Sequence, residues 1–106
     1  MSSQPAASSS APRCAVVGAS GYSGAELVSL LARHPSARLV SIHADTSAGQ
    51  RFDALHPARR GHGPAVIEPF VPEALAGLDV VFLALPHGAS AAAAAALAGK
   101  VGHVID

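Results

Sequence analysis

The 106-residue sequence has little of several residue types on which particular classes of protein depend. A single cysteine, Cys14, excludes an intramolecular disulfide and a zinc site built from cysteines. Only 13% of the residues are charged and 4% are aromatic, so the sequence lacks the basic clusters and stacking partners of a nucleic-acid-binding protein. No apolar run reaches the roughly 20 residues that a membrane span needs. We therefore expect no nucleic-acid partner, no membrane partner and no metal, and a reducing, cytoplasmic location.

What the sequence does have is hydrophobic residues, at 50% of the chain, enough for one folded domain. Residues 1–12, MSSQPAASSSAP, carry neither the positive nor the apolar segment of a secretory signal. Their Ser/Ala/Pro composition is typical of a flexible tail. The prediction is a tail at 1–12 and one domain at 13–106.

Strand-like and helix-like segments alternate through that domain, which is typical of an α/β fold with a doubly wound, Rossmann-like parallel sheet. Strands are predicted at residues 14–17, 38–44, 65–71, 79–85 and 101–106, and helices from 22 to about 34 and at 90–98. Right-handed crossovers then place the strand at 14–17 in the centre, between those at 38–44 and 79–85. Nothing follows the last strand to cover it, so we expect a domain truncated before its catalytic part.

Two further structural expectations follow from spacing and composition. Leu27, Leu30, Leu31 and His34 have the i, i+3, i+4, i+7 spacing of one helix face, which predicts that this face is buried. About 20 residues rich in Arg, His, Gly and Pro separate the second and third strands. A structureless connection of that length is usually functional or mobile.

The most informative motif is a G-x-x-G-x-x-G turn between the first strand and the first helix. Its residues are Gly18, Ala19, Ser20, Gly21, Tyr22, Ser23 and Gly24. Here a pyrophosphate can approach backbone N–H groups at a helix N-terminus, where a Cβ would obstruct it. We assign the tight exit from the strand to Gly18, the approach of phosphate to Gly21 and close helix packing to Gly24, with hydroxyl donors on Ser20 and Ser23.

Residue types alone leave the choice between NAD and NADP open. Asp45 lies about 20 residues beyond the glycines, where an acidic residue holds the ribose of NAD. Thr46, Ser47 and Arg51 lie near it and are suited to a 2′-phosphate instead. Asp45 is also an ordinary turn or cap residue, whose side chain turns away in that case.

Several motifs occur together in the order of one known family. The strings GASGYSGAELVSLLARHP and DVVFLALPHG, with Thr46-Ser47-Ala48-Gly49 and the Leu55-His56-Pro57 step between them, cover most of residues 13–106. The chain resembles the N-terminal cofactor domain of the N-acetyl-gamma-glutamyl-phosphate reductases, relatives of aspartate-semialdehyde dehydrogenase. The resemblance implies NADPH-dependent reductive dephosphorylation of an acyl phosphate in arginine biosynthesis, by a homo-oligomeric full-length enzyme.

The resemblance also implies roles for particular residues. Ser20, Gly21, Tyr22 and Ser23 would contact the pyrophosphate, and Thr46 or Ser47 the 2′-phosphate. Pro86 and His87 would lie by the nicotinamide half, although His87 is equally a turn residue before a helix. Members often carry an arginine beside the serine after the second strand, and this chain does not.

The family's nucleophilic cysteine and catalytic histidine lie beyond the length of this chain, so no catalytic residue is assigned. Cys14 lies inside the first strand, where a thiol is buried and inert. The long loop has local positive character, which comes from His56 and His62 together with Arg51, Arg59 and Arg60. It is either a solvated loop or an interface with the missing domain or with an acidic ligand.

Two alternatives to this function remain open. One is another semialdehyde dehydrogenase, which acts on aspartyl phosphate or on a carrier-bound aminoadipyl analogue. The other is a non-catalytic NAD(P)-binding module.

Overall fold

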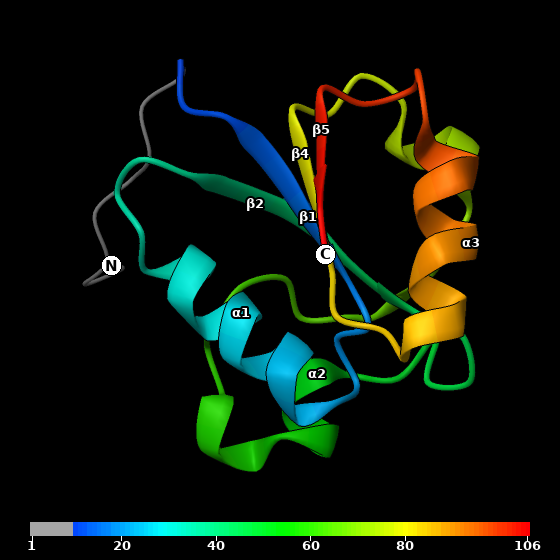
Figure 1. The fold of residues 1–106 in the computed structure, drawn as a ribbon. Coiled ribbons are helices and arrows are strands. Elements are labelled where there is room, and N and C mark those ends of the chain that lie inside the picture. Colours follow the sequence, from blue (N-terminus) through cyan, green and yellow to red (C-terminus); the bar gives the residue numbers. More distant parts are fainter. Residues whose placement is uncertain (1–9) are drawn as a thin grey trace.

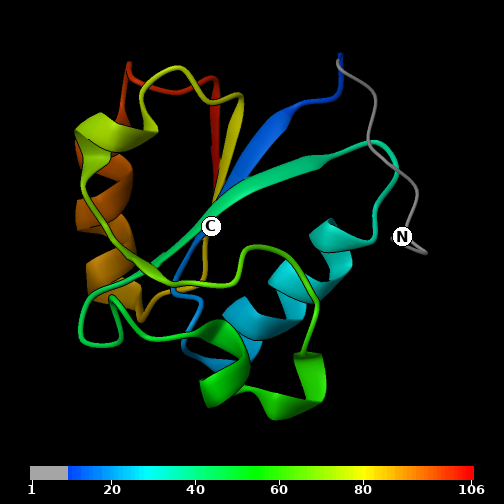
Figure 2. The same ribbon diagram turned by 180° about the vertical axis from the view of Figure 1, so that it is seen from behind.

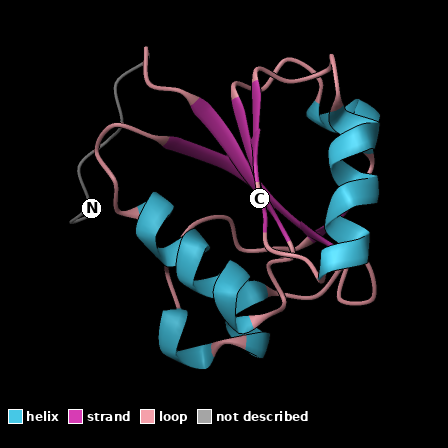
Figure 3. Ribbon diagram, viewed as in Figure 1, coloured by secondary structure: helices cyan, strands magenta, loops and turns pink. Residues whose placement is uncertain are grey.

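The computed structural model describes residues 10–106, so residues 1–9 of the predicted tail lie outside the described part. The fold is a parallel sheet with helices on both faces (Figures 1 and 3). The strands are β1 (Arg13–Val17), β2 (Arg38–Ala44), β3 (Glu68–Pro69), β4 (Val80–Leu83) and β5 (His103–Ile105). The helices are α1 (Tyr22–Ala32), α2 (Phe52–Leu55) and α3 (His87–Leu97), with 3-10 turns η1 (Pro57–Arg59) and η2 (Pro72–Leu75).

The strand order is β3-β2-β1-β4-β5, and every strand pair is parallel. Val16 in β1 is opposite Ile42 in β2 on one side and Phe82 in β4 on the other. The prediction of a doubly wound parallel sheet with the Cys14 strand at its centre is therefore confirmed.

Helices cover both faces of the sheet (Figures 1 and 2), and each face has its own apolar core. Alternate side chains of β1 point to opposite faces, so Val17 belongs to one core and Val16 to the other. On the Val17 side, α3 and η2 contribute Ala93, Leu97 and Leu75. On the Val16 side, α1 and α2 contribute mainly Ala25, Val28 and Phe52. Burial on both faces explains why residues 14–17 of β1 are continuously apolar.

The predicted buried face of α1 is only partly right: Leu27 and Leu31 pack against the core, but Leu30 and His34 do not. The helix buries Gly24, Ala25, Val28 and Ser29, whereas the side chain of Leu30 is 52% exposed. Leu27 and Leu31 are only half-buried, and His34 is exposed beyond the end of the helix. Small residues bring α1 close to the sheet, and that closeness turns the larger leucines toward its flanks and away from its buried centre.

Several predicted element boundaries also need correction, among them the strand expected at 79–85, which is limited to Val80–Leu83. The strand expected at 65–71 contains only two residues, because Pro69 has no N–H for the ladder and the preceding segment instead pairs with the loop after β2. In that pairing, Ile67 N donates to Gln50 O at 2.9 Å. The helix expected at 90–98 begins earlier, at His87. The strand expected at 101–106 is limited to His103–Ile105, on the edge of the sheet.

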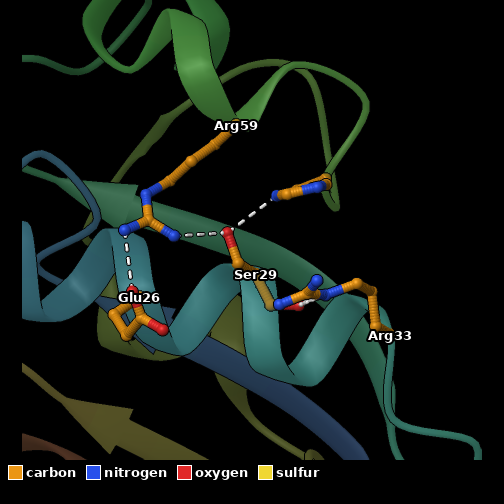
Figure 4. A network of polar contacts seen from close by, with 5 residues as sticks. Glu26, Ser29, Arg33 and Arg59 are labelled. Carbon is orange, nitrogen blue, oxygen red and sulfur yellow. Dashed lines mark hydrogen bonds and ion pairs between the residues drawn. The ribbon is translucent and has the colours of Figure 1, made fainter.

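The long connection after β2 contains structure, contrary to the expectation of a structureless loop. It folds into α2 and η1, and a polar network joins η1 to α1 (Figure 4). Arg59 donates to Ser29 Oγ at 2.8 Å and to Glu26 Oε1 at 2.7 Å. His62 Nδ1 lies 2.8 Å from the same hydroxyl, and Arg33 Nε donates to Ser29 O. Ser29 is fully buried, so this connection is fixed against α1.

Replacing a leucine by alanine should affect stability very differently in α3 and in α1. Leu97→Ala, in the core under α3, should lower the free energy of unfolding by about 2–5 kcal/mol because it leaves a cavity. Leu30→Ala on the exposed side of α1 should change it by less than about 0.5 kcal/mol. Urea denaturation of both variants measures the difference, and similar losses in the two would contradict the burial described.

Candidate functional site

The glycine turn lies where β1 ends and α1 begins. Both α1 and α3 start at this edge of the sheet, on opposite faces of it (Figure 1). The edge is formed by the carboxyl ends of parallel strands, where ligands of open α/β sheets bind. The turn therefore occupies the position at which the sequence motif predicts a phosphate site.

Gly18 and Gly24 are required by close backbone contacts. Gly18 has a φ of +100°, and a Cβ there would lie 2.3 Å from Ala84 O. A Cβ on Gly24 would lie 2.0 Å from Gly18 O. Both contacts are far shorter than any real Cβ makes, so only glycine allows α1, β1 and the end of β4 to approach this closely.

Gly21 is different, because the space around it is open. A Cβ on Gly21 would meet only Gly18 O, at 3.8 Å. Gly21 is the N-cap of α1, its backbone is extended, and no side chain caps the helix. Tyr22 and Ser23, the first two helical residues, are exposed. The N–H groups of the first helical turn have no acceptor within the helix, and they lie at the positive end of the helix dipole.

The inner half of the turn is already hydrogen-bonded to the protein. The N–H groups of Gly18 and Ala19 donate to His43 O at 2.8 and 3.1 Å. The His43 ring is itself fixed between Ser41 Oγ at 2.7 Å and Pro69 O at 3.0 Å. Gly18 and Ala19 are therefore anchored to β2, whereas Gly21, Tyr22 and Ser23 are exposed.

A cavity of about 280 Å³ adjoins the carboxyl ends of β1 and β2 on the α3 face. Its lining residues are all apolar except Asp45, and they are Val17, Ala44, Asp45, Phe70, Leu85, Ala89, Ala92, Ala93 and Ala96. The lining side of α3 is alanine-rich, which leaves room that larger side chains would fill. An apolar cavity with one polar group is typical of a small-molecule site.

Thr46 and Ser47 lie in the turn that follows Asp45, and Thr46 is exposed. The expectation that the Asp45 side chain caps this turn is not met. Among the described residues the Asp45 carboxylate has no hydrogen-bond partner, and only its backbone carbonyl accepts, from Ala48 N at 3.3 Å. Asp45 instead borders the apolar cavity.

Arg51 does not lie with Asp45 in the cavity on the α3 face. Its Nε and second guanidinium nitrogen donate to the two oxygens of Asp53, at 3.1 and 3.2 Å. These hydrogen bonds lower the pKa of the Asp53 carboxyl. Both residues line a separate surface hollow of about 370 Å³, which also includes Arg59 and Arg60.

Pro86 and His87 lie together at the N-terminus of α3. Pro86 is the N-cap, and its carbonyl accepts from Ser90 N at 2.9 Å. Both side chains are exposed. Ser90, one turn further on, is buried and donates to Asp106 Oδ1 at 2.7 Å, which joins α3 to the residue after β5.

One residue that the sequence analysis did not connect with the glycine turn contacts it directly. His56 Nε2 lies 3.1 Å from Ser20 O, between positions 36 residues apart. The only sequence signal was the Leu55-His56-Pro57 step, which carries no information about a backbone carbonyl so distant in the chain.

Cys14 is 3% exposed in β1, as expected for a structural cysteine. Burial raises the pKa of its thiol, and the negative charge of Asp79 raises it further. A thiol kept protonated in this way is a poor nucleophile. Within residues 10–106 there is no group of three or more His, Cys, Asp or Glu side chains arranged to hold a metal ion, and no helix long and apolar enough to cross a membrane.

A glycine turn at the central strand, an uncapped helix N-terminus and a parallel sheet define a Rossmann-like dinucleotide-binding domain. Residues 13–106 match the family model described as the semialdehyde dehydrogenase, NAD binding domain. The chain belongs to this family.

Named relatives give the same family. The chain is 50% identical over 91 residues to an N-acetyl-gamma-glutamyl-phosphate reductase of Streptomyces coelicolor, covering 86% of this chain and 27% of the relative. An enzyme of the same name from Salinispora arenicola is 51% identical over 94 residues, covering 89% and 28%. The chain therefore spans about a quarter of the length of these relatives.

A solved structure has a similar fold. The aspartate semialdehyde dehydrogenase with NADP from Candida albicans matches with a TM-score of 0.63 at 22% identity, over 82% of this chain and 26% of that chain. The shared fold therefore covers most of this chain.

A glycine-to-serine substitution should affect stability differently at two positions of the turn. Gly24→Ser should lower the free energy of unfolding by about 1–3 kcal/mol, because the new side chain collides with Gly18 O. Gly21→Ser should be tolerated within about 0.5 kcal/mol, because the position is open and serine is a good N-cap. Denaturant titration of both variants tests this, and an equal loss at Gly21 would show that the open space is not real.

Proposed function

We propose that this chain is the NADP-binding domain of an N-acetyl-gamma-glutamyl-phosphate reductase. The observation that carries the proposal is the 50% identity over 91 residues to an enzyme of that name, together with a glycine turn that leads into a helix N-terminus without a side-chain cap. The reaction is the NADPH-dependent reductive dephosphorylation of N-acetyl-glutamyl phosphate to the semialdehyde. The acyl-phosphate substrate, a homo-oligomeric assembly and a cytoplasmic location belong to this proposal.

In this proposal the glycine turn binds the pyrophosphate. The open space at Gly21 accommodates a phosphate that a larger side chain would displace. N–H groups of Tyr22, Ser23 and Gly24 donate to its oxygens, assisted by the α1 dipole and the hydroxyls of Ser20 and Ser23. Gly18 and Ala19 act by shaping the turn, since their own N–H groups are bonded to His43 O.

The adenosine half would occupy the apolar cavity beside Asp45 and α3. Thr46 and Ser47, which follow Asp45, are placed to donate to a 2′-phosphate. Arg51 is left out of this role because Asp53 already holds its guanidinium. On the other side of β1, Pro86 and His87 border the nicotinamide half.

When bound, NADPH supplies the hydride for reduction. The chain's own residues bind and orient the cofactor, and none of them supplies the nucleophile, since Cys14 is buried in β1. We expect these 106 residues alone to bind NADPH weakly and to show no turnover.

Gly21→Val should abolish NADPH binding, because its branched side chain occupies the space of the phosphate. Valine is a poor N-cap, so stability should fall by only about 1 kcal/mol and the fold should persist. Isothermal titration with NADPH measures the affinity, and circular dichroism checks the fold.

Ser36→Val, in the exposed turn after α1, provides a matched control that should bind NADPH as the wild type does. Equal affinities of the wild type and Gly21→Val would refute the phosphate role of the turn.

The wild type should bind NADPH at least about tenfold more tightly than NADH, because charge-assisted hydrogen bonds to a 2′-phosphate contribute about 1.5–3 kcal/mol. Asp45→Asn should leave NADPH the preferred cofactor. Competition binding of the two nucleotides measures both ratios. A wild type that prefers NADH, together with an Asp45→Asn variant shifted toward NADPH, would mean that Asp45 binds the ribose and that the choice of NADP is wrong.

A further inference from the structure

His56 contacts the glycine turn from outside it. Its ring nitrogen Nε2 lies 3.1 Å from the carbonyl oxygen of Ser20. A carbonyl oxygen only accepts hydrogen bonds, so Nε2 must carry a hydrogen and donate it. The contact therefore specifies the Nε2–H form of the neutral ring, with the same donor present in the charged ring.

The ring of His56 is held in place by α2. It packs against the ring of Phe52, with centroids 5.1 Å apart and planes inclined by 49°. The backbone N–H of His56 also donates to Phe52 O at 2.9 Å. Phe52 is 1% exposed and forms part of the α1-side core. A side chain fixed to the core in this way can fix another group in turn.

The group that it fixes is the peptide between Ser20 and Gly21. The carbonyl of this peptide accepts from His56, and its N–H donates to Gly18 O at 3.2 Å. Both ends of the peptide are therefore held. Gly21 O then accepts from Ala25 N at 2.9 Å, which closes the first turn of α1.

Two consequences follow for an incoming phosphate. The partial negative charge of the Ser20 carbonyl is compensated by a donor, which reduces its repulsion of an anion. The peptide that leads into the free N–H groups of the first turn also keeps one orientation, so less ordering remains to be done on binding.

We propose that His56 is a positioning residue of the dinucleotide site, whose Nε2–H holds the Ser20–Gly21 peptide in the orientation that binds phosphate. The proposal rests on the proposed function of the turn and adds a residue outside the motif to it. His56 acts through the Ser20 carbonyl and need not touch the cofactor.

The test compares His56→Leu, which removes the donor, with His56→Gln, whose amide N–H can reach the same carbonyl. His56→Leu should bind NADPH about 3- to 10-fold more weakly, as expected for the loss of one hydrogen bond. His56→Gln should recover most of that loss. The same two substitutions at His103, an exposed residue of β5, are matched controls and should leave the affinity unchanged.

Thermal unfolding without nucleotide shows whether each variant is folded. Wild-type affinity in a folded His56→Leu variant, or equal weakening in folded Leu and Gln variants, would overturn the role of His56 while leaving the function of the turn intact. Absence of NADPH binding by the wild type would overturn the proposed function itself, and this inference with it.

Nitrogen-15 NMR of the free protein tests the contact without any nucleotide. It should show His56 protonated at Nε2, and the Gly21 amide signal should move in His56→Leu and return toward its wild-type position in His56→Gln. A neutral ring protonated at Nδ1 instead would contradict the proposal, even if the Leu variant failed to fold.

Discussion

The structure depends on the close approach of three backbone segments at the carboxyl end of β1. Gly18 lies against Ala84 O after β4, and Gly24 lies against Gly18 O, at distances that no Cβ can occupy. This contact sets the position of α1 over the sheet and the direction in which its N-terminus points. It also joins β1 to β4, whose continuation leads to α3. The free N–H groups of α1 and the cavity under α3 therefore lie at one edge of one sheet.

The order of the elements could be predicted because each strand and turn carries a local signal. The run DVVFLAL and the GASGYSG turn indicate a buried strand and a strand-to-helix connection without any tertiary information. The buried face of α1 could not be predicted from leucine spacing. Close backbone packing favours Gly24, Ala25 and Ser29 at the contact, so the large apolar residues of this helix do not mark its buried face.

The motif of the candidate site can be read from the sequence, but the contacts that hold it in place cannot. The glycine turn and Thr46-Ser47 could be proposed from residue types and order. The contacts that support the turn join residues far apart in the sequence: the His56 ring donates to Ser20 O, and His43 O accepts from the N–H groups of Gly18 and Ala19. Arg51 illustrates the converse, because it is near Asp45 in sequence but its guanidinium pairs with Asp53, two positions further on. Neither its orientation nor that of Asp45 is encoded in local composition. The choice between NAD and NADP depends on such orientations, which only the folded turn defines.

The central claim is that the outer N–H groups of the glycine turn bind the pyrophosphate of a dinucleotide. The most direct measurement is a crystal structure of the protein with NADPH. The account predicts pyrophosphate oxygens within about 3 Å of the backbone nitrogens of Tyr22 and Ser23, with the adenine in the cavity bordered by Asp45 and α3. A nucleotide bound instead in the arginine-lined hollow beside Arg60, with the turn unchanged, would contradict it.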